Sequence, residues 1–166
     1  MTYTRPGKTE YYLGIAEMIA RRGTCLRRNY GAVIVNDDQI ISTGYTGAPR
    51  GTKNCIDIGS CYRKEKKIPE GERYELCRSV HAEMNAIIHA SRRQLLNSSL
   101  YIVGLSANGN KCVKNAEPCK LCKRLIINSG ISTVFVGRGK DNILKMKVED
   151  WIKNEKEWFS LETEHY

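Results

Sequence analysis

The sequence predicts an α/β fold in which a mixed sheet of about five strands is sandwiched between helices in three layers. Apolar segments with helical spacing alternate along the chain with short runs of β-branched residues. Such alternation implies right-handed crossovers and a sheet that contains parallel strand pairs. The length of 166 residues suffices for one buried core, and neither a repeat nor a linker interrupts the sequence. We therefore expect a single domain over residues 1–166.

The first third of the chain is predicted to form a helix followed by a hairpin. Helical spacing of apolar residues extends over 11–22 and ends at Gly23, a residue type that often closes helices in the left-handed conformation. Two β-branched runs, 32–35 and 40–43, are separated by a turn-prone Asn-Asp-Asp sequence, which favours a β-hairpin. Residues 44–59 contain several glycines and no apolar period, so a long functional loop is expected there.

The remainder of the chain is predicted to alternate helices and strands. A cysteine-bearing insertion occupies about 47–78, and the C-terminal strand and helix fall within about 143–166. Apolar periodicity and helix stop signals place helices at about 80–93, 119–130 and 149–158. Strands are expected at about 99–105, 132–137 and 143–148.

Composition restricts the compartment and the class of ligand. The N-terminal sequence "MTYTRPGKTE" has no apolar signal region, and no stretch approaches the roughly 20 apolar residues of a membrane span. We therefore expect a cytoplasmic protein without a membrane partner. The net charge of +9 indicates attraction to a polyanion or a phosphorylated ligand, although scattered solvated faces explain most of the basic residues. Seven cysteines in a reducing compartment point to metal binding or catalysis.

Two short motifs carry the chemistry. His81 and Glu83 lie two residues apart where an apolar helical pattern begins, so both side chains can lean toward whatever lies in front of the helix N-terminus. Alone, this pair is equally consistent with an ordinary polar helix start. Cys119 and Cys122 lie three apart at another helix start, directly after Pro118, where both sulfurs can reach one metal.

Together the motifs predict a catalytic zinc site. Cys119, Cys122 and His81 would supply three ligands and leave the fourth position for water, which is the catalytic arrangement. Glu83 would then lie beside that water as general acid and base. The combination H-x-E with P-C-x-x-C is the signature of zinc nucleobase deaminases. A structural zinc site with an incidental glutamate is the alternative.

Three segments extend these motifs over most of residues 11–137: "GIAEMIARRGTCLRRNYGAVIVNDDQIISTGYTGAPRG", "LCRSVHAEMNAI" and "EPCKLCKRLIINSGI". By these segments the chain resembles the cytidine and deoxycytidylate deaminase superfamily, and its deoxycytidylate branch in particular. The resemblance implies a cytidine-deaminase-like fold and zinc-dependent hydrolysis of deoxycytidine monophosphate (dCMP) to deoxyuridine monophosphate (dUMP) and ammonia, without an organic cofactor. It further implies base contacts from the backbone around Ala82 and Pro118, a homo-oligomer, commonly a hexamer, and regulation by dCTP and dTTP.

One position departs from the family pattern. The family usually has asparagine in "GYNGAP", where the amide is thought to contact the nucleotide, whereas this chain has Thr46. A threonine hydroxyl still forms a hydrogen bond but lacks the bidentate amide. Substrate recognition, rather than the catalytic step, is affected by this change.

Four further cysteines match the number that a closed structural zinc site requires. Some deoxycytidylate deaminases carry a second zinc near this insertion, and the resemblance extends that expectation to this chain. The alternative is that some of these thiols are small buried hydrophobic groups. Cys112 has no nearby partner in the sequence and is predicted to be a free thiol. The four candidate ligands are Cys25, Cys55, Cys61 and Cys77.

A mononucleotide enzyme also needs a phosphate site. Basic residues next to the glycine-rich loop suit phosphate, because arginine forks form charge-assisted hydrogen bonds. Ordinary surface charge is the alternative for each of them. The candidates are Arg27, Arg28, Arg50 and Lys53.

Other functions remain open at this level. The enzyme could act on another cytosine nucleotide or on bases in nucleic acid. A non-catalytic zinc-binding nucleic-acid module would use the same cysteines and positive charge, but it would need neither Glu83 nor an open coordination position.

Overall fold

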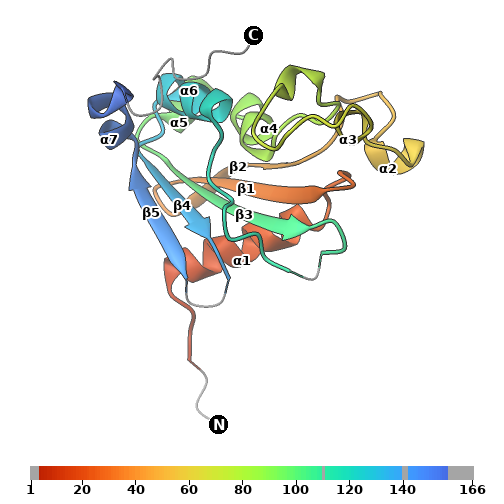
Figure 1. Cartoon of the computed structure of the whole chain (residues 1–166). Helices are drawn as coiled ribbons and strands as arrows, with labels where there is room; N and C mark the ends of the chain where they lie inside the picture. Colours follow the sequence, from red (N-terminus) through yellow and green to blue (C-terminus); the bar gives the residue numbers. More distant parts are fainter. Residues whose placement is uncertain (1–3, 110, 140–141, 157–166) are drawn as a thin grey trace.

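The computed structural model describes residues 4–109, 111–139 and 142–156, and it contains one mixed sheet of five strands in the order β2-β1-β3-β4-β5. Helix α1 (Lys8–Ala20) covers one face, and the remaining large helices cover the other (Figure 1). The predicted three-layer α/β fold is thereby confirmed. The strands are β1 (Arg28–Asn36), β2 (Gln39–Tyr45), β3 (Ser99–Ser106), β4 (Thr133–Gly137) and β5 (Ile143–Lys147). The opposite layer contains α4 (Ala82–Ile88), α5 (Arg92–Leu95), α6 (Lys120–Ser129) and α7 (Val148–Lys153).

Strand directions are more mixed than alternation alone implies. Strands β3 and β4 are parallel, joined by a crossover through α6, whereas the other three neighbouring pairs are antiparallel. The β1–β2 pair is the predicted hairpin. Its two loop residues, Asp37 and Asp38, have φ values of 47° and 60°, as a two-residue type I′ turn requires.

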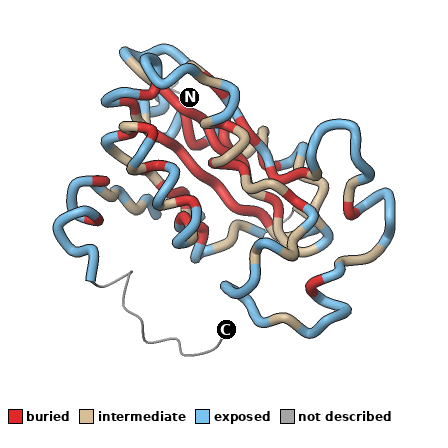
Figure 2. Tube along the Cα trace, turned by 90° about the horizontal axis from the view of Figure 1, so that it is seen from above, coloured by how far each residue is buried: buried red, intermediate tan, exposed pale blue. Residues whose placement is uncertain are grey.

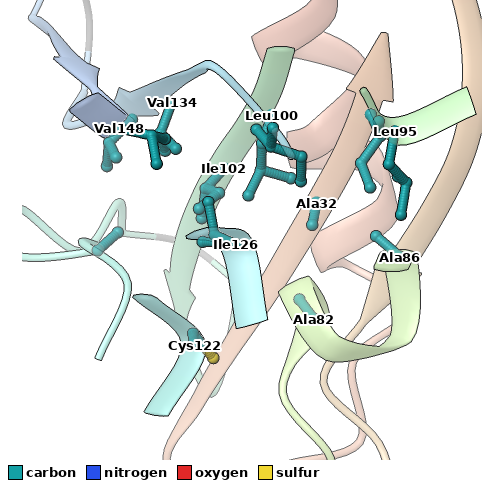
Figure 3. Packing of buried hydrophobic residues seen from close by; sticks show 14 of the residues in the cluster. Ala32, Ala82, Ala86, Leu95, Leu100, Ile102, Cys122, Ile126, Val134 and Val148 are labelled. Carbon is teal, nitrogen blue, oxygen red and sulfur yellow. The ribbon is translucent and has the colours of Figure 1, made fainter. Parts of the chain in front are cut away.

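Successive residues of the central strands point to opposite faces and build two separate cores. On the α1 side, Val33, Tyr101 and Val103 pack with Leu13 and Ala16. The other core faces α4 and α6 (Figure 3) and contains Ala32, Ile34, Leu100, Ile102, Val134, Ala82, Ala86, Cys122 and Ile126. Figure 2 shows this buried centre surrounded by exposed loops and helix surfaces. The sheet is therefore a rigid platform between two helical layers.

Two glycines set the distance between the platform and its helices. A Cβ atom on Gly44 would lie 2.2 Å from the carbonyl oxygen of Ala82, so α4 packs directly against the backbone of β2. A Cβ atom on Gly31 would lie 2.0 Å from the carbonyl oxygen of Ala16 on the opposite face. Since real Cβ contacts are never that short, side chains at these positions would force the helices away from the sheet.

Several predicted boundaries require correction. Helix α1 ends at Ala20, and Gly23 is not in the left-handed conformation. Glycine is needed at position 23 because a Cβ atom there would lie 2.4 Å from the side-chain oxygen of Asn29. The predicted helix 80–93 is divided into α4 and α5, because Ser91 and Gln94 form a capping box that starts a new helix. Of the predicted C-terminal helix, α7 covers 148–153, and residues 157–158 lie outside the described part.

The insertion projects beyond one end of the sheet beside α4 (Figure 1). It is not one continuous loop, because α2 (Cys55–Ile58), α3 (Tyr62–Glu65) and the 3-10 segment η1 (Tyr74–Leu76) interrupt it. Helix α2 begins where Asn54 and Asp57 form a capping box. None of the helices that the structure describes has the length and apolar character of a membrane span.

Candidate active site

The two predicted motifs meet at the N-termini of neighbouring helices. His81 is the N-cap residue of α4, and Cys119 is the N-cap residue of α6. Both helices pack on the same face of the sheet, where Ala82 and Cys122 lie in one core (Figure 3). Residues separated by almost forty positions in the sequence are thereby brought together, as the motif pairing predicts.

The three side chains form a compact ligand set. Nδ1 of His81 lies 3.6 Å from Sγ of Cys119 and 3.3 Å from Sγ of Cys122. Typical zinc–nitrogen and zinc–sulfur bond lengths place two such atoms about 3.6 Å apart around one tetrahedral ion. Among the described residues, this is the one group of three or more His, Cys, Asp or Glu side chains whose ligand atoms all lie within 4.8 Å of one another. The donor set and its spacing fit a zinc ion.

Glu83 stands next to this set without belonging to it. Glu83 is 5% exposed, and burial raises the pKa of its carboxyl group. The carboxylate is therefore not a surface charge of the helix start. It faces the same cavity as His81 and Cys119.

The two thiols differ in protonation. The hydrogen bond that Cys119 accepts from Cys122 lowers the pKa of Cys119 to about 4, with a further contribution from His81. The same bond, together with burial, raises the pKa of Cys122. The pKa values of the two thiols are therefore shifted in opposite directions, downward for Cys119 and upward for Cys122.

A cavity of about 310 Å³ opens in front of these groups. The ring of Tyr74 meets the His81 imidazole edge-on, with centroids 4.9 Å apart and planes at 89°. Tyr30 also lines the cavity, and burial raises the pKa of its hydroxyl group, while the nearby Arg28 acts in the opposite direction. The cavity therefore combines aromatic walls with charged groups, which is typical of a small-ligand site.

The predicted substrate residues fall into two groups. Thr46, Arg27 and Arg28 line the cavity, whereas Arg50 and Lys53 are exposed and are not among its lining residues. The hydroxyl oxygen of Thr46 accepts a hydrogen bond from the backbone N–H of Tyr30 at 3.0 Å, so it already has a structural partner. Ala82, predicted to contact the base, is fully buried and is not among the lining residues of the cavity.

The four remaining candidate cysteines all line the same cavity: Cys25, Cys55, Cys61 and Cys77. Their charges influence one another, since Cys25, Cys61 and Cys77 contribute to the raised pKa of Cys55, in which burial dominates. Their sulfurs do not form a second group within 4.8 Å. Cys112 lies elsewhere, where its thiol is directed to the carbonyl oxygen of Gly137 at 3.5 Å.

Arg63, Glu70 and Tyr74 are among the cavity residues that sequence reasoning missed. Arg63 lies in the charged run "RKEKK", which suggests a solvated surface, yet this residue is 6% exposed. Its guanidinium group lies 4.8 Å from the centroid of the Tyr74 ring. No local signal marks any of the three, because each is defined by contacts between separate turns of the insertion.

Comparison with known proteins places this geometry in context. The family model described as "Cytidine and deoxycytidylate deaminase zinc-binding region" matches residues 6–138. A deoxycytidylate deaminase of Mycobacterium phage D29 is 37% identical over 136 residues, which cover 79% of this chain and 94% of that protein. A deoxycytidylate deaminase of Schizosaccharomyces pombe is 32% identical over 130 residues, and these cover 78% of this chain but 37% of the fission yeast protein.

Solved structures agree on the fold. The dCMP deaminase of cyanophage S-TIM5 in apo form aligns with a TM-score of 0.56 at 23% identity, over 83% of this chain and 88% of that one. The cytidine deaminase of Burkholderia pseudomallei aligns with a TM-score of 0.55 at 14% identity, over 90% and 95% of the two chains.

Proposed function

This chain belongs to the cytidine and deoxycytidylate deaminase family, and from that premise we propose that it catalyses the zinc-dependent hydrolytic deamination of dCMP to dUMP and ammonia. The observation that carries the proposal is the pairing of a compact His81, Cys119 and Cys122 ligand set with a buried glutamate at the same cavity. The deoxycytidylate specificity is supported by the phage relative, which bears that name and shares nearly its whole length with this chain.

The proposed chemistry uses the residues in distinct roles. A zinc ion held by His81, Cys119 and Cys122 would supply a Lewis acid that lowers the pKa of water beside Glu83. Glu83 accepts a proton from that water as the oxygen adds to C4 of the pyrimidine, and it delivers this proton to ring N3. It then accepts the proton of the new C4 hydroxyl group and passes it to the exocyclic amine as the C4–N bond breaks, so ammonia leaves and a C4 carbonyl remains.

The phosphate end of the substrate is assigned to Arg27 and Arg28. Both line the cavity that contains Glu83, and an arginine fork suits the oxygens of a phosphate. Arg50 and Lys53, the other two candidates, lie outside the cavity lining, and we expect them to contribute less.

We also propose a second, structural zinc site formed by four cysteines, namely Cys25, Cys55, Cys61 and Cys77. The support is that these four cysteines, which come from separate segments of the chain, all line the same cavity. A metal at this place would connect the insertion to the segment before α4. Oligomerisation, commonly as a hexamer, regulation by dCTP and dTTP, and a cytoplasmic location stay predictions from the family resemblance.

Ammonia release from a panel of compounds tests the proposed function. The panel contains dCMP, deoxycytidine, dCTP and a cytosine-containing single-stranded oligonucleotide, at two salt concentrations, with zinc content measured on the same sample. We expect the highest kcat/KM for dCMP. Preference for the oligonucleotide, with a steep loss of activity at high salt, would instead support the polynucleotide alternative.

A further inference from the structure

A carboxylate occupies the proposed phosphate site in the ligand-free chain. Glu70 accepts hydrogen bonds from Nη2 of Arg27 at 3.2 Å and from Nη2 of Arg28 at 3.1 Å, through its two oxygens. All three residues line the cavity that contains His81 and Glu83. The two arginines that are best placed for a substrate anion are therefore already bound to an anion of the protein itself.

The backbone around Glu70 is fixed independently of this contact. Nη2 of the buried Arg63 donates to the carbonyl oxygens of Pro69, at 2.7 Å, and Glu72, which flank Glu70 on both sides. The Glu70 side chain itself is 60% exposed. Release of the two arginines therefore needs only a rotation of one solvent-facing side chain about its single bonds, while Arg63 keeps the neighbouring backbone in place.

We propose that Glu70 is a specificity-determining residue that competes internally with the substrate's phosphate for Arg27 and Arg28. The inference rests on the proposed function, because it assumes that these arginines receive a phosphate. A phosphate monoester displaces the carboxylate because it carries nearly twice the charge and three acceptor oxygens. For a ligand that needs both arginines, the apparent dissociation constant equals the intrinsic one divided by the fraction of molecules in which Glu70 leaves the arginines free. A ligand without phosphate is unaffected.

Equilibrium binding to the zinc-loaded protein tests this competition. Inorganic phosphate and the unreactive product dUMP are titrated calorimetrically into the wild type, Glu70→Gln and Glu65→Gln. Glu65 lines the same cavity and has no ion pair among the described residues, so its substitution controls for a general change in charge. We expect Glu70→Gln to lower both dissociation constants by about 1.5- to 5-fold, the range for exposed ion pairs. Glu65→Gln should leave both nearly unchanged.

A double variant tests whether Glu70 acts through Arg28. In Arg28→Ala, the additional Glu70→Gln substitution should lower the dissociation constants by less than it does in the wild type, because one of the two contested side chains is gone. Unchanged or higher dissociation constants in the single variant Glu70→Gln would overturn the inference, and so would an equal gain in Glu65→Gln. Circular dichroism confirms that each variant is folded.

Kinetics separate this inference from the proposed function. A wild type that prefers deoxycytidine to dCMP would refute the proposed function, while tighter phosphate binding by Glu70→Gln would still support the role of Glu70. Conversely, a wild type that prefers dCMP, combined with unchanged phosphate affinity in Glu70→Gln, would refute the role of Glu70 alone. For dCMP we expect a lower KM in Glu70→Gln, with kcat/KM for deoxycytidine unchanged.

Discussion

The two walls of the active-site cavity are built in different ways. One wall carries His81, Glu83 and Cys119 and is formed by the N-termini of two helices that pack directly on the sheet. Glu83 in this wall is 5% exposed. The other wall comes from the insertion, whose short helical segments are joined by exposed turns, and the Glu70 side chain there is 60% exposed. Glu83, the proposed acid–base group, is therefore held by packing, whereas Glu70, the proposed competitor for the phosphate site, stands where its side chain can rearrange.

The largest expected effect is on the packed wall. Glu83→Gln keeps the shape of the side chain but removes its ability to accept and donate a proton. Because general acid–base catalysis contributes about 10² to 10⁴ per transfer and Glu83 serves more than one, kcat should fall by at least about 10³-fold. Zinc content should be unchanged. Near-normal turnover by a zinc-loaded variant would show that the catalytic group has been assigned wrongly.

A substitution in the sheet tests whether packing positions this wall. Gly44→Ala places a methyl group against the backbone of α4, so we expect a loss of about 3 kcal/mol in the free energy of unfolding and reduced activity. Gly14→Ala is the matched control, because no atom lies within 4 Å of a Cβ at this position in α1. There we expect stabilisation of about 0.5 to 1 kcal/mol. Equal responses in urea unfolding would contradict the role of Gly44.

The proposed structural zinc predicts that the insertion responds to loss of metal ligands rather than to changes in core packing. Cys55→Ser and Cys61→Ser should lower the zinc content from two ions to one per chain and reduce the melting temperature, since a structural metal contributes folding free energy. Cys112→Ser is the control, because this thiol does not line the cavity. A wild type with one zinc per chain, and equal melting temperatures in all three variants, would remove the second site.

The smallest effect in this series concerns ligand selection. Arg28→Ala should reduce kcat/KM for dCMP by about 10-fold, because one charge-assisted hydrogen bond to phosphate is lost, and should leave deoxycytidine nearly unaffected. Arg50→Ala removes the same charge outside the cavity lining and should change the ratio of the two substrates much less. Equal effects of the two variants would indicate that net charge, rather than a defined phosphate site, attracts the nucleotide.

The sequence alone determined the strands, the hairpin turn and the metal motifs, because each of these features depends on residues that are close together in the sequence. Runs of β-branched residues predict β1 to β4, and apolar residues alternating with lysines predict β5. Asp37 and Asp38 fit the turn that a two-residue hairpin needs. His81 and Cys119 could be identified because each lies at a helix start only two or three residues before a second functional residue, which gives a recognisable short motif.

Only the tertiary structure decided which charges belong to the cavity. Arg63 lies in a run that resembles a solvated surface but is buried within the insertion, and Arg50 adjoins the glycine-rich loop but is not among the cavity's lining residues. Glu70 meets Arg27 and Arg28 across more than forty residues of chain. Periodicity cannot predict such pairs, because the approach of two irregular segments depends on the packing of every element between them.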